Sequence, residues 1–103
     1  TFGYDNLVVD MTAVPRMKAF APVVIADCTH ATQRPNQASG VSGGDPAMIE
    51  TLAKAATAAG ADGLFIEVHP QPAEALSDAA SMLPLDQLEG LLERVLRVRE
   101  SLF

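Results

Sequence analysis

The sequence predicts an α/β fold in which two parallel strands are joined by a helix. Two short apolar runs, residues 23–28 and 63–68, flank a segment whose apolar residues recur at helical spacing. Neither run alternates polar and apolar side chains, which is typical of parallel strands buried on both faces. The order strand, helix, strand therefore predicts a right-handed crossover, with helices covering each side of the sheet.

The elements before the central helix follow from local signals. Residues 10–20, DMTAVPRMKAF, predict a short helix with Pro15 near its start. Pro22 precedes the first strand, which β-branched residues favour over 23–28. A polar loop rich in Gly and Ser then leads to the central helix.

The central helix has a clear start and stop. Asp45 is expected to cap it, Pro46 suits the first helical position, and Gly60 ends it. Its apolar positions recur at helical spacing: Ile49, Leu52, Ala53 and Ala56. The second strand follows within three residues.

Residues 85–102, LDQLEGLLERVLRVRESL, predict an amphipathic last helix. Asp86 and Glu89 have the spacing of a capping box, with Asp in place of the usual Ser or Thr. The residues expected on its buried face are Leu88, Leu92, Val95 and Leu102.

Two strands and about three helices do not complete such a sheet. The outer edges of both strands would stay unpaired, which compact domains avoid. We therefore expect the chain to be the end of a larger α/β fold. It has no internal repeat and no linker that would indicate two domains.

Composition excludes several classes of partner. The 103 residues are 49% hydrophobic and carry a net charge of −6, which argues against nucleic acid or an anionic membrane surface. No apolar run approaches the ~20 residues of a membrane helix, and no secretory signal is expected. The single cysteine, Cys28, forms no internal disulfide, which fits a reducing cytoplasm.

Polar residues follow both predicted strands at their carboxyl ends. Functional residues of parallel α/β folds usually lie at these ends. DCTH ends the first strand at His30, and EVH begins at Glu67 on the second. By alternation His30 should share a face with Cys28, and Glu67 with Phe65. An ionised Glu67 after an apolar strand needs a partner. With Asp78 folded back, one imidazole and two carboxylates form a candidate site for a divalent metal.

Simpler interpretations stay open at this point. His30 could be a hydrogen-bonded structural residue, Glu67 could pair with an arginine, and Asp78 could form a turn. Cys28 is more typical of a small core residue than of a ligand. GVSGG, residues 40–44, lacks the Lys and Ser or Thr of a phosphate-binding P-loop.

Three motifs resemble a known family along essentially the whole chain. They are FGYDNLVVDM, DCTHATQRP with SGG behind it, and GADGLFIEVHPQPAEALSDAASMLPLDQLE. Together they resemble the 3-deoxy-D-manno-octulosonate 8-phosphate synthases. The related 3-deoxy-D-arabino-heptulosonate 7-phosphate synthases share the strand-end His but usually lack FGYDNLVVD and THATQ. The first family is therefore favoured, and a non-catalytic α/β binding module is a further alternative.

The resemblance implies a (β/α)8 TIM barrel, which takes ~250 residues. Residues 1–103 would be the C-terminal portion of a single aldolase-type barrel domain, with its seventh and eighth strands and last helices. The groups that grip phosphoenolpyruvate would lie mostly on the rest of the barrel. We therefore expect the isolated 103 residues to be inactive.

The implied reaction condenses phosphoenolpyruvate with D-arabinose 5-phosphate in the Kdo branch of lipopolysaccharide biosynthesis. The enol carbon attacks the aldehyde, water adds at the carbon bearing the phosphate, and phosphate leaves by C–O cleavage. By resemblance the enzyme is a cytoplasmic homotetramer, acts on small molecules and needs no organic cofactor.

The resemblance also assigns roles to residues. His30 would be a metal ligand beside phosphoenolpyruvate, with Glu67 and Asp78 as further ligands. Gln33 would lie near the sugar phosphate. Phe2 and the loop 42–44 would border the site with less specific roles. The resemblance gives Cys28 no ligand role and makes His69 a supporting or structural residue.

Metal dependence divides the family that this chain resembles. One branch carries Cys-Asp-Gly-Pro where this chain has Ser-Asp-Ala-Ala at residues 77–80, and it needs no metal. The sequence matches the metal-dependent branch better, in which a cysteine of the first barrel strand is a further ligand. Imidazole, carboxylates and a thiolate suit zinc, iron or manganese better than calcium.

Overall fold

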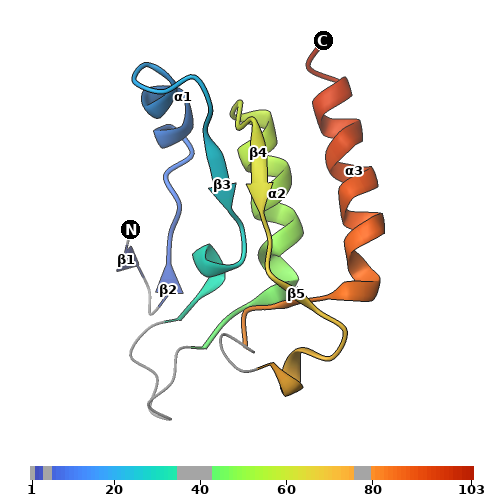
Figure 1. Ribbon diagram of the computed structural model, residues 1–103. Coiled ribbons are helices and arrows are strands. Elements are labelled where there is room, and N and C mark those ends of the chain that lie inside the picture. The colour runs from blue at the N-terminus through green and yellow to red at the C-terminus, as the bar shows by residue number, and fades with distance from the viewer. Residues whose placement is uncertain (1, 4–5, 35–42, 76–79) are drawn as a thin grey trace.

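The computed structural model describes residues 2–3, 6–34, 43–75 and 80–103 and shows an α/β arrangement (Figure 1). Short 3₁₀ turns, labelled η, precede or follow several of the main elements. The order is β1 Phe2–Gly3, β2 Asn6–Leu7, α1 Ala13–Lys18, β3 Ile25–Asp27, η1 His30–Thr32, η2 Pro46–Met48, α2 Ile49–Ala58, β4 Gly63–Phe65, β5 Val68–His69, η3 Pro72–Glu74, β6 Leu83–Pro84, η4 Leu85–Gln87 and α3 Leu88–Glu100.

The predicted strand–helix–strand unit is present. β3 and β4 pair in parallel, with Ile25 opposite Gly63 and Asp27 opposite Phe65. Both strands are shorter than expected, because the chain turns at Cys28 after β3 and leaves the ladder at Ile66 after β4. A second parallel pair, β5 with β6, continues beyond that break.

Both ends of the central helix were predicted correctly, although its cap was not. Pro46 opens η2, which runs directly into α2, and Gly60 follows the helix with a φ of 106°. The Asp45 side chain makes no capping hydrogen bond. Because the first turn is 3₁₀, the Asp45 carbonyl accepts from the Met48 N–H instead, and the carboxylate lies 3.6 Å from Arg34 Nη2.

The core lies between the strands and the helices α2 and α3. α2 and α3 pack against each other and cover one face of the β3–β4 pair (Figure 1). The buried cluster consists of Cys28, Ile49, Ala53, Leu83, Leu91 and Val95, with Ala26, Leu64, Ile66, Val68 and Leu88 packed around it. Burial of this apolar surface is what holds the described unit together.

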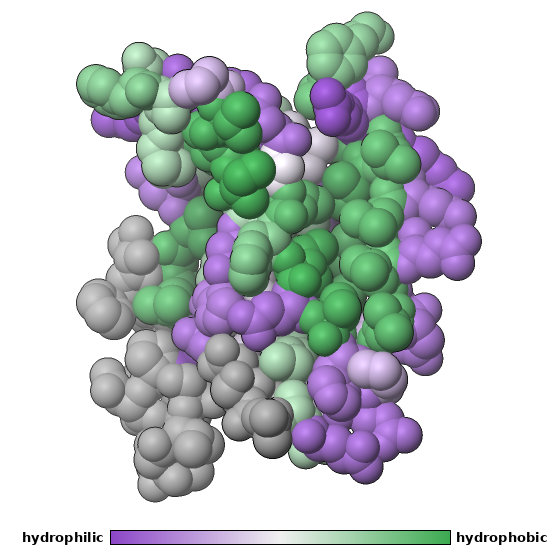
Figure 2. Space-filling view, viewed as in Figure 1, coloured by the Kyte–Doolittle hydropathy of each residue, from purple (hydrophilic) through white to green (hydrophobic). Residues whose placement is uncertain are grey.

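The opposite face of the two strands is bare, contrary to the expectation of cover on each side. Ile25 is 55% exposed and Phe65 50% exposed, and Val23 just before β3 is exposed as well. Figure 2 shows apolar residues gathered over the strands on this side. The expectation failed for the described residues because α2, with α3 packed beside it, covers only the other face.

The buried face of α3 differs from the predicted one. Leu88 and Val95 do face the core, but Leu92 and Leu102 are exposed, and Leu91 is buried in their place. Contact with α2 selects the stripe through Leu91 and Val95, which are four residues apart.

The predicted capping box of α3 does not form. A 3₁₀ turn, η4, precedes the helix, so that Gln87 is the N-cap residue of α3, and its side chain makes no capping hydrogen bond. Asp86 therefore lies inside that turn and not at the cap position. None of the helices described is both long and apolar enough to cross a membrane.

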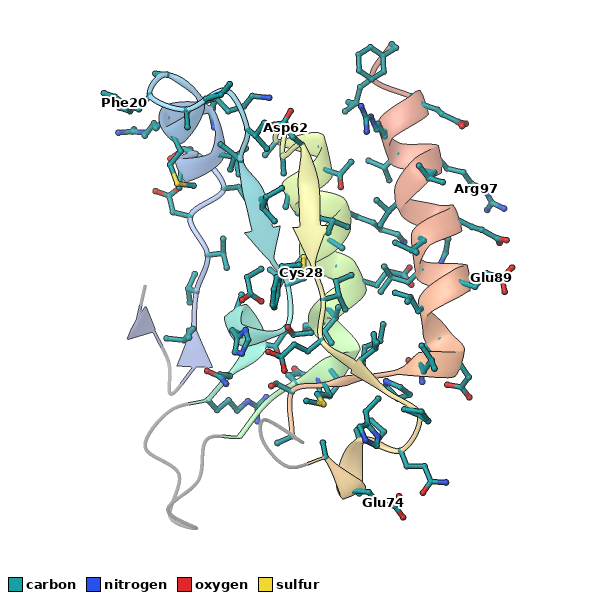
Figure 3. The ribbon with its side chains drawn as sticks, in the orientation of Figure 1. Phe20, Cys28, Asp62, Glu74, Glu89 and Arg97 are labelled. Carbon is teal, nitrogen blue, oxygen red and sulfur yellow. The ribbon has the colours of Figure 1, made fainter. Side chains whose placement is uncertain are left out.

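Asp62, just before β4, fixes the register of the two strands at the end opposite the site (Figure 3). Its carboxylate accepts from the Val24 N–H at 2.9 Å and from Lys18 Nζ at 3.0 Å. Its own N–H donates to the Val24 carbonyl at 2.9 Å. These bonds align the start of both strands, so that Asp27 and Phe65 end side by side.

Candidate functional site

The carboxyl ends of β3 and β4 bring the predicted imidazole and carboxylate together. His30 opens η1, and its Nε2 lies 3.1 Å from Oε1 of Glu67. Its Nδ1 lies 2.6 Å from Oδ2 of Asp27. The ring also packs beside Phe65, with 6.2 Å between ring centroids. His30 is therefore the partner of Glu67, and the same imidazole also contacts Asp27 through its other nitrogen.

His30 does not lie on the face that strand alternation predicted. Cys28 points into the core beside α2, whereas His30 contacts Phe65 and Glu67. The prediction was wrong because β3 ends at Asp27, and the turn at residues 28–29 reverses the alternation before η1 begins. The same turn is what brings the imidazole over the end of β4.

Asp27 is a site residue that the sequence analysis missed. Its Oδ1 accepts hydrogen bonds from the His30 N–H at 3.0 Å and from the Thr29 N–H and hydroxyl at 3.2 Å each. Partial burial disfavours its charge, but the bonds from His30 and Thr29 together hold the pKa of Asp27 below its ordinary value. The available signal was the pattern Asp-x-Thr-His, which is typical of an Asp accepting from the next turn.

Thr29 connects the two strand ends. Its side chain is only 1% exposed, and its hydroxyl donates to Asp27 Oδ1 while accepting from the Glu67 N–H at 3.3 Å. The Thr29 carbonyl in turn accepts from the Thr32 hydroxyl at 2.8 Å. The backbone at Glu67 is thus attached to the turn that carries His30.

The donor set suits a divalent metal in its chemistry and spacing. Two ligand atoms, each about 2.1 Å from a shared ion at 90–109°, lie about 3.0–3.4 Å apart, close to the separation of His30 Nε2 and Glu67 Oε1. Within the described part of the chain, no three His, Cys, Asp or Glu side chains are arranged to hold an ion. The predicted third ligand, Asp78, lies outside the described residues.

The other candidates with metal-binding side chains take structural positions. Cys28 is fully buried, and burial together with the nearby Asp27 charge raises the pKa of its thiol to about 11, so it stays protonated. The Nδ1 atom of His69 accepts from the Gln71 N–H at 2.9 Å, which holds the turn after β5. Neither residue competes with His30 as a ligand.

Gln33 and Phe2 are described mainly through their backbones. Gln33 follows η1, where its N–H donates to the His30 carbonyl at 3.1 Å and its carbonyl accepts from the Leu7 N–H at 3.3 Å. Phe2 pairs with Leu7 in the β1–β2 ladder. The β1–β2 ladder therefore lies beside η1 and its last turn. Their substrate-binding roles stay predictions.

The loop 42–44 is described only at Gly43 and Gly44. Gly43 bridges to Arg34 through two backbone hydrogen bonds of 2.8 and 3.0 Å, which close the loop after η1. Gly44 passes so close to Ser81 that an added Cβ would lie 2.8 Å from its Cα. The loop after β3 thus touches the segment that follows residue 78.

Comparison with known proteins settles the family. The family model described as the DAHP synthetase I family matches residues 1–102. This chain belongs to that family. The residues that place His30 and Glu67 at the ends of two adjacent parallel strands are therefore part of a DAHP synthetase I family protein.

Three curated relatives similar to this chain carry the same name. Proteins of Desulfotalea psychrophila and Koribacter versatilis, each 51% identical, and one of Helicobacter pylori, 50% identical, are named 2-dehydro-3-deoxyphosphooctonate aldolase. The matches cover 96–98% of this chain. The chain spans only 36–37% of the length of these relatives.

A solved structure of the sister activity has a similar fold. The chain superposes on phospho-2-dehydro-3-deoxyheptonate aldolase, a DAHP synthase of Thermotoga maritima, with a TM-score of 0.77 and 27% identity. The match covers 99% of this chain and 27% of the other. The α/β arrangement is thus shared with a DAHP synthase of known structure.

Proposed function

We propose that the chain is part of an enzyme that condenses phosphoenolpyruvate with D-arabinose 5-phosphate to 3-deoxy-D-manno-octulosonate 8-phosphate and phosphate. The observation that carries the proposal is the contact between His30 and Glu67 at adjacent strand ends. It occurs in a chain about half identical to proteins named 2-dehydro-3-deoxyphosphooctonate aldolase, another name for this synthase. The resemblance of the motifs points to the same reaction.

Residues 1–103 would form the C-terminal portion of the aldolase-type barrel. The bare apolar face of β3 and β4, with Ile25 and Phe65 half exposed, has the character of a barrel interior in need of further strands. Among the described residues these two strands pair only with each other, so both outer edges are available to neighbours. The homotetramer and the cytoplasmic location stay predictions.

The residues of this chain would bind and orient the reactants. His30 would lie beside phosphoenolpyruvate, and Gln33, three residues further on, would face the phosphate of the sugar. Phe2 and the loop 42–44 would border the site. His30, Glu67 and Asp78 would hold a divalent ion, which when bound supplies a Lewis acid to orient the aldehyde or the attacking water. Zinc, iron and manganese fit these nitrogen and oxygen donors.

The sister reaction is the second candidate, because both the family model and the solved structure carry its name. It would use erythrose 4-phosphate in place of arabinose 5-phosphate. The motifs FGYDNLVVD and THATQ favour the five-carbon sugar.

The choice is tested by offering each aldose with phosphoenolpyruvate to the complete protein and measuring released phosphate. We expect a kcat/KM at least about 10-fold higher with arabinose 5-phosphate, since a site built for one phosphate position rejects a shorter sugar. Preference for erythrose 4-phosphate would assign the sister reaction. Turnover of neither sugar would favour the non-catalytic binding module.

A further inference from the structure

We propose that Asp27 is the positioning residue of His30: it holds the hydrogen of the neutral imidazole on Nδ1 and so leaves Nε2, on the side of Glu67, to bind a metal ion. The predicted effect on metal affinity rests on the proposed function, whereas the predicted tautomer of His30 does not. The geometry that carries the inference is local, because Asp27 contacts both the backbone and the ring of His30.

The two oxygens of Asp27 have separate tasks. Oδ1 accepts from three donors, the N–H groups of Thr29 and His30 and the Thr29 hydroxyl. These bonds fix the plane of the carboxylate, which leaves Oδ2 facing Nδ1 of His30 at 2.6 Å. A carboxylate only accepts, and both ring nitrogens face one, but Oδ2 of Asp27 lies closer to Nδ1, at 2.6 Å, than Oε1 of Glu67 lies to Nε2, at 3.1 Å. When the ring carries a single hydrogen, Nδ1 is therefore its favoured place, and Nε2 is the atom that would bind an ion shared with Glu67.

Thr29 extends this control to the second candidate ligand. A hydroxyl has one hydrogen, and that of Thr29 points to Asp27, so its oxygen presents a lone pair to the Glu67 N–H. Because Thr29 is almost fully buried, its hydroxyl cannot turn toward solvent and give up these two hydrogen bonds. The turn that carries His30 thus also holds the backbone at Glu67. Residues that support metal ligands in this way typically change metal affinity 10–100-fold when replaced.

Asp27→Asn is the sharpest test, since it changes one oxygen to an amide nitrogen. The amide oxygen would keep the three donors at the Oδ1 position, which places the NH₂ group against Nδ1 of His30. Two donors cannot share that contact, so the proton should move to Nε2. Asp45→Asn is the matched control, because Asp45 also lies near the strand ends and contacts Arg34 but not His30.

Two measurements on the complete protein are combined. The tautomer of His30 is determined without metal by ¹⁵N NMR of histidine-labelled protein, at a pH where the ring is neutral, with signals assigned against His30→Gln. The affinity of the metal-free protein for Zn²⁺ is measured by titration calorimetry. We expect the Nδ1–H form in the wild type and in Asp45→Asn. We expect the Nε2–H form and a 10–100-fold weaker Zn²⁺ affinity in Asp27→Asn.

A second pair of variants covers the case in which Asp27→Asn fails to fold. Thr29→Val removes the hydroxyl at nearly constant volume, whereas Thr29→Ser keeps it. We expect Thr29→Val to weaken Zn²⁺ binding and Thr29→Ser to restore most of it. An unchanged tautomer in Asp27→Asn, or an equal loss of affinity in Asp45→Asn, overturns the proposal, and so does equal behaviour of the two Thr29 variants.

The outcomes separate this inference from the proposed function. A wild-type protein that takes up no Zn²⁺ would contradict the metal site proposed for the enzyme. The tautomer comparison between the wild type and Asp27→Asn still decides whether Asp27 positions His30. Conversely, an unchanged tautomer with tight Zn²⁺ binding would leave the metal site standing and remove Asp27 from it.

Discussion

At Gly44 the backbone just before η2 comes into close contact with the backbone at Ala80 and Ser81. An added Cβ would lie 2.6 Å from the Ala80 carbonyl oxygen and 2.8 Å from Ser81 Cα, both of which belong to the backbone and cannot turn away. Gly44→Ala must therefore push the two segments apart. We expect it to lower the free energy of unfolding by about 1–3 kcal/mol.

Gly90→Ala is the matched control for this prediction. There the added Cβ would meet the end of the flexible Arg94 side chain at 3.0 Å, inside α3. Alanine is favoured over glycine in a helix by about 0.5–1 kcal/mol, so this variant should be as stable as the wild type or more stable. Chemical denaturation of the complete protein measures both. Equal shifts of the two midpoints would show that the close contact at Gly44 carries no cost.

At the residue scale the sequence predicted which side chains meet but not how. Strand ends in a parallel sheet must share an edge, so His30 and Glu67 were expected together, and they lie 3.1 Å apart. The face of His30 was wrong, because alternation holds only while the strand lasts, and β3 ends at Asp27. Asp27 itself was missed because it looked like part of a strand and not like the first residue of a turn. Asp78 lies outside the described residues.

At the scale of elements, Glu50 joins the two helices that cover the sheet. Its carboxylate accepts from Arg94 Nε at 2.8 Å and Nη2 at 2.6 Å, and Lys54 Nζ lies 2.7 Å away. The hydrogen bond from Arg94, and then that from Lys54, lower the pKa of Glu50 to about 2. Because the group is partly exposed, solvent screens the pair, and we expect Glu50→Gln to cost only about 0.5–1 kcal/mol of stability at neutral pH.

The pH dependence of that cost follows from the sign of the pKa shift. A carboxyl whose pKa is lower in the folded state stabilises the fold above its unfolded value near 4.5, and this contribution is lost as the pH falls toward about 2. The difference in melting temperature between wild type and Glu50→Gln should shrink over that window. Glu89→Gln, on the outer side of α3 (Figure 3), is the control and should cost less. A pH-independent difference would mean that packing, not charge, links the helices.

Element ends were more predictable than element faces. Pro46 and Gly60 act through their own backbone preferences, so they marked the ends of the central helix correctly. The face of α3 depends on which leucines meet α2, and Leu88, Leu91 and Leu92 offer more than one apolar stripe. Contact with α2 buries Leu91 and leaves Leu92 exposed, and the local sequence pattern could not predict this. The capping signals at Asp45 and Asp86 failed because 3₁₀ turns precede both helices.

At the scale of the whole molecule, the described residues cover one face of the β3–β4 pair and leave the other bare, which agrees with the relation of the chain to longer proteins. α2 and α3 bury one side of β3 and β4, whereas Ile25 and Phe65 stay half exposed on the other (Figures 1 and 2). The curated relatives are nearly three times as long as this chain. The α/β class was thus predictable from the order of strands and helices. Local sequence patterns could not predict which segments cover the second face of the strands.

The proposed synthase, which uses phosphoenolpyruvate and arabinose 5-phosphate, would hold a divalent metal through His30, Glu67 and Asp78. The most direct test is to strip the complete protein with a chelator, remove the chelator, and measure phosphate release before and after adding Mn²⁺ or Zn²⁺. We expect a loss of at least about 100-fold on stripping, as a Lewis acid contributes several kcal/mol, and recovery on adding metal. Full activity in protein shown to be free of metal would contradict the claim, leaving Glu67 and His30 as a hydrogen-bonded pair.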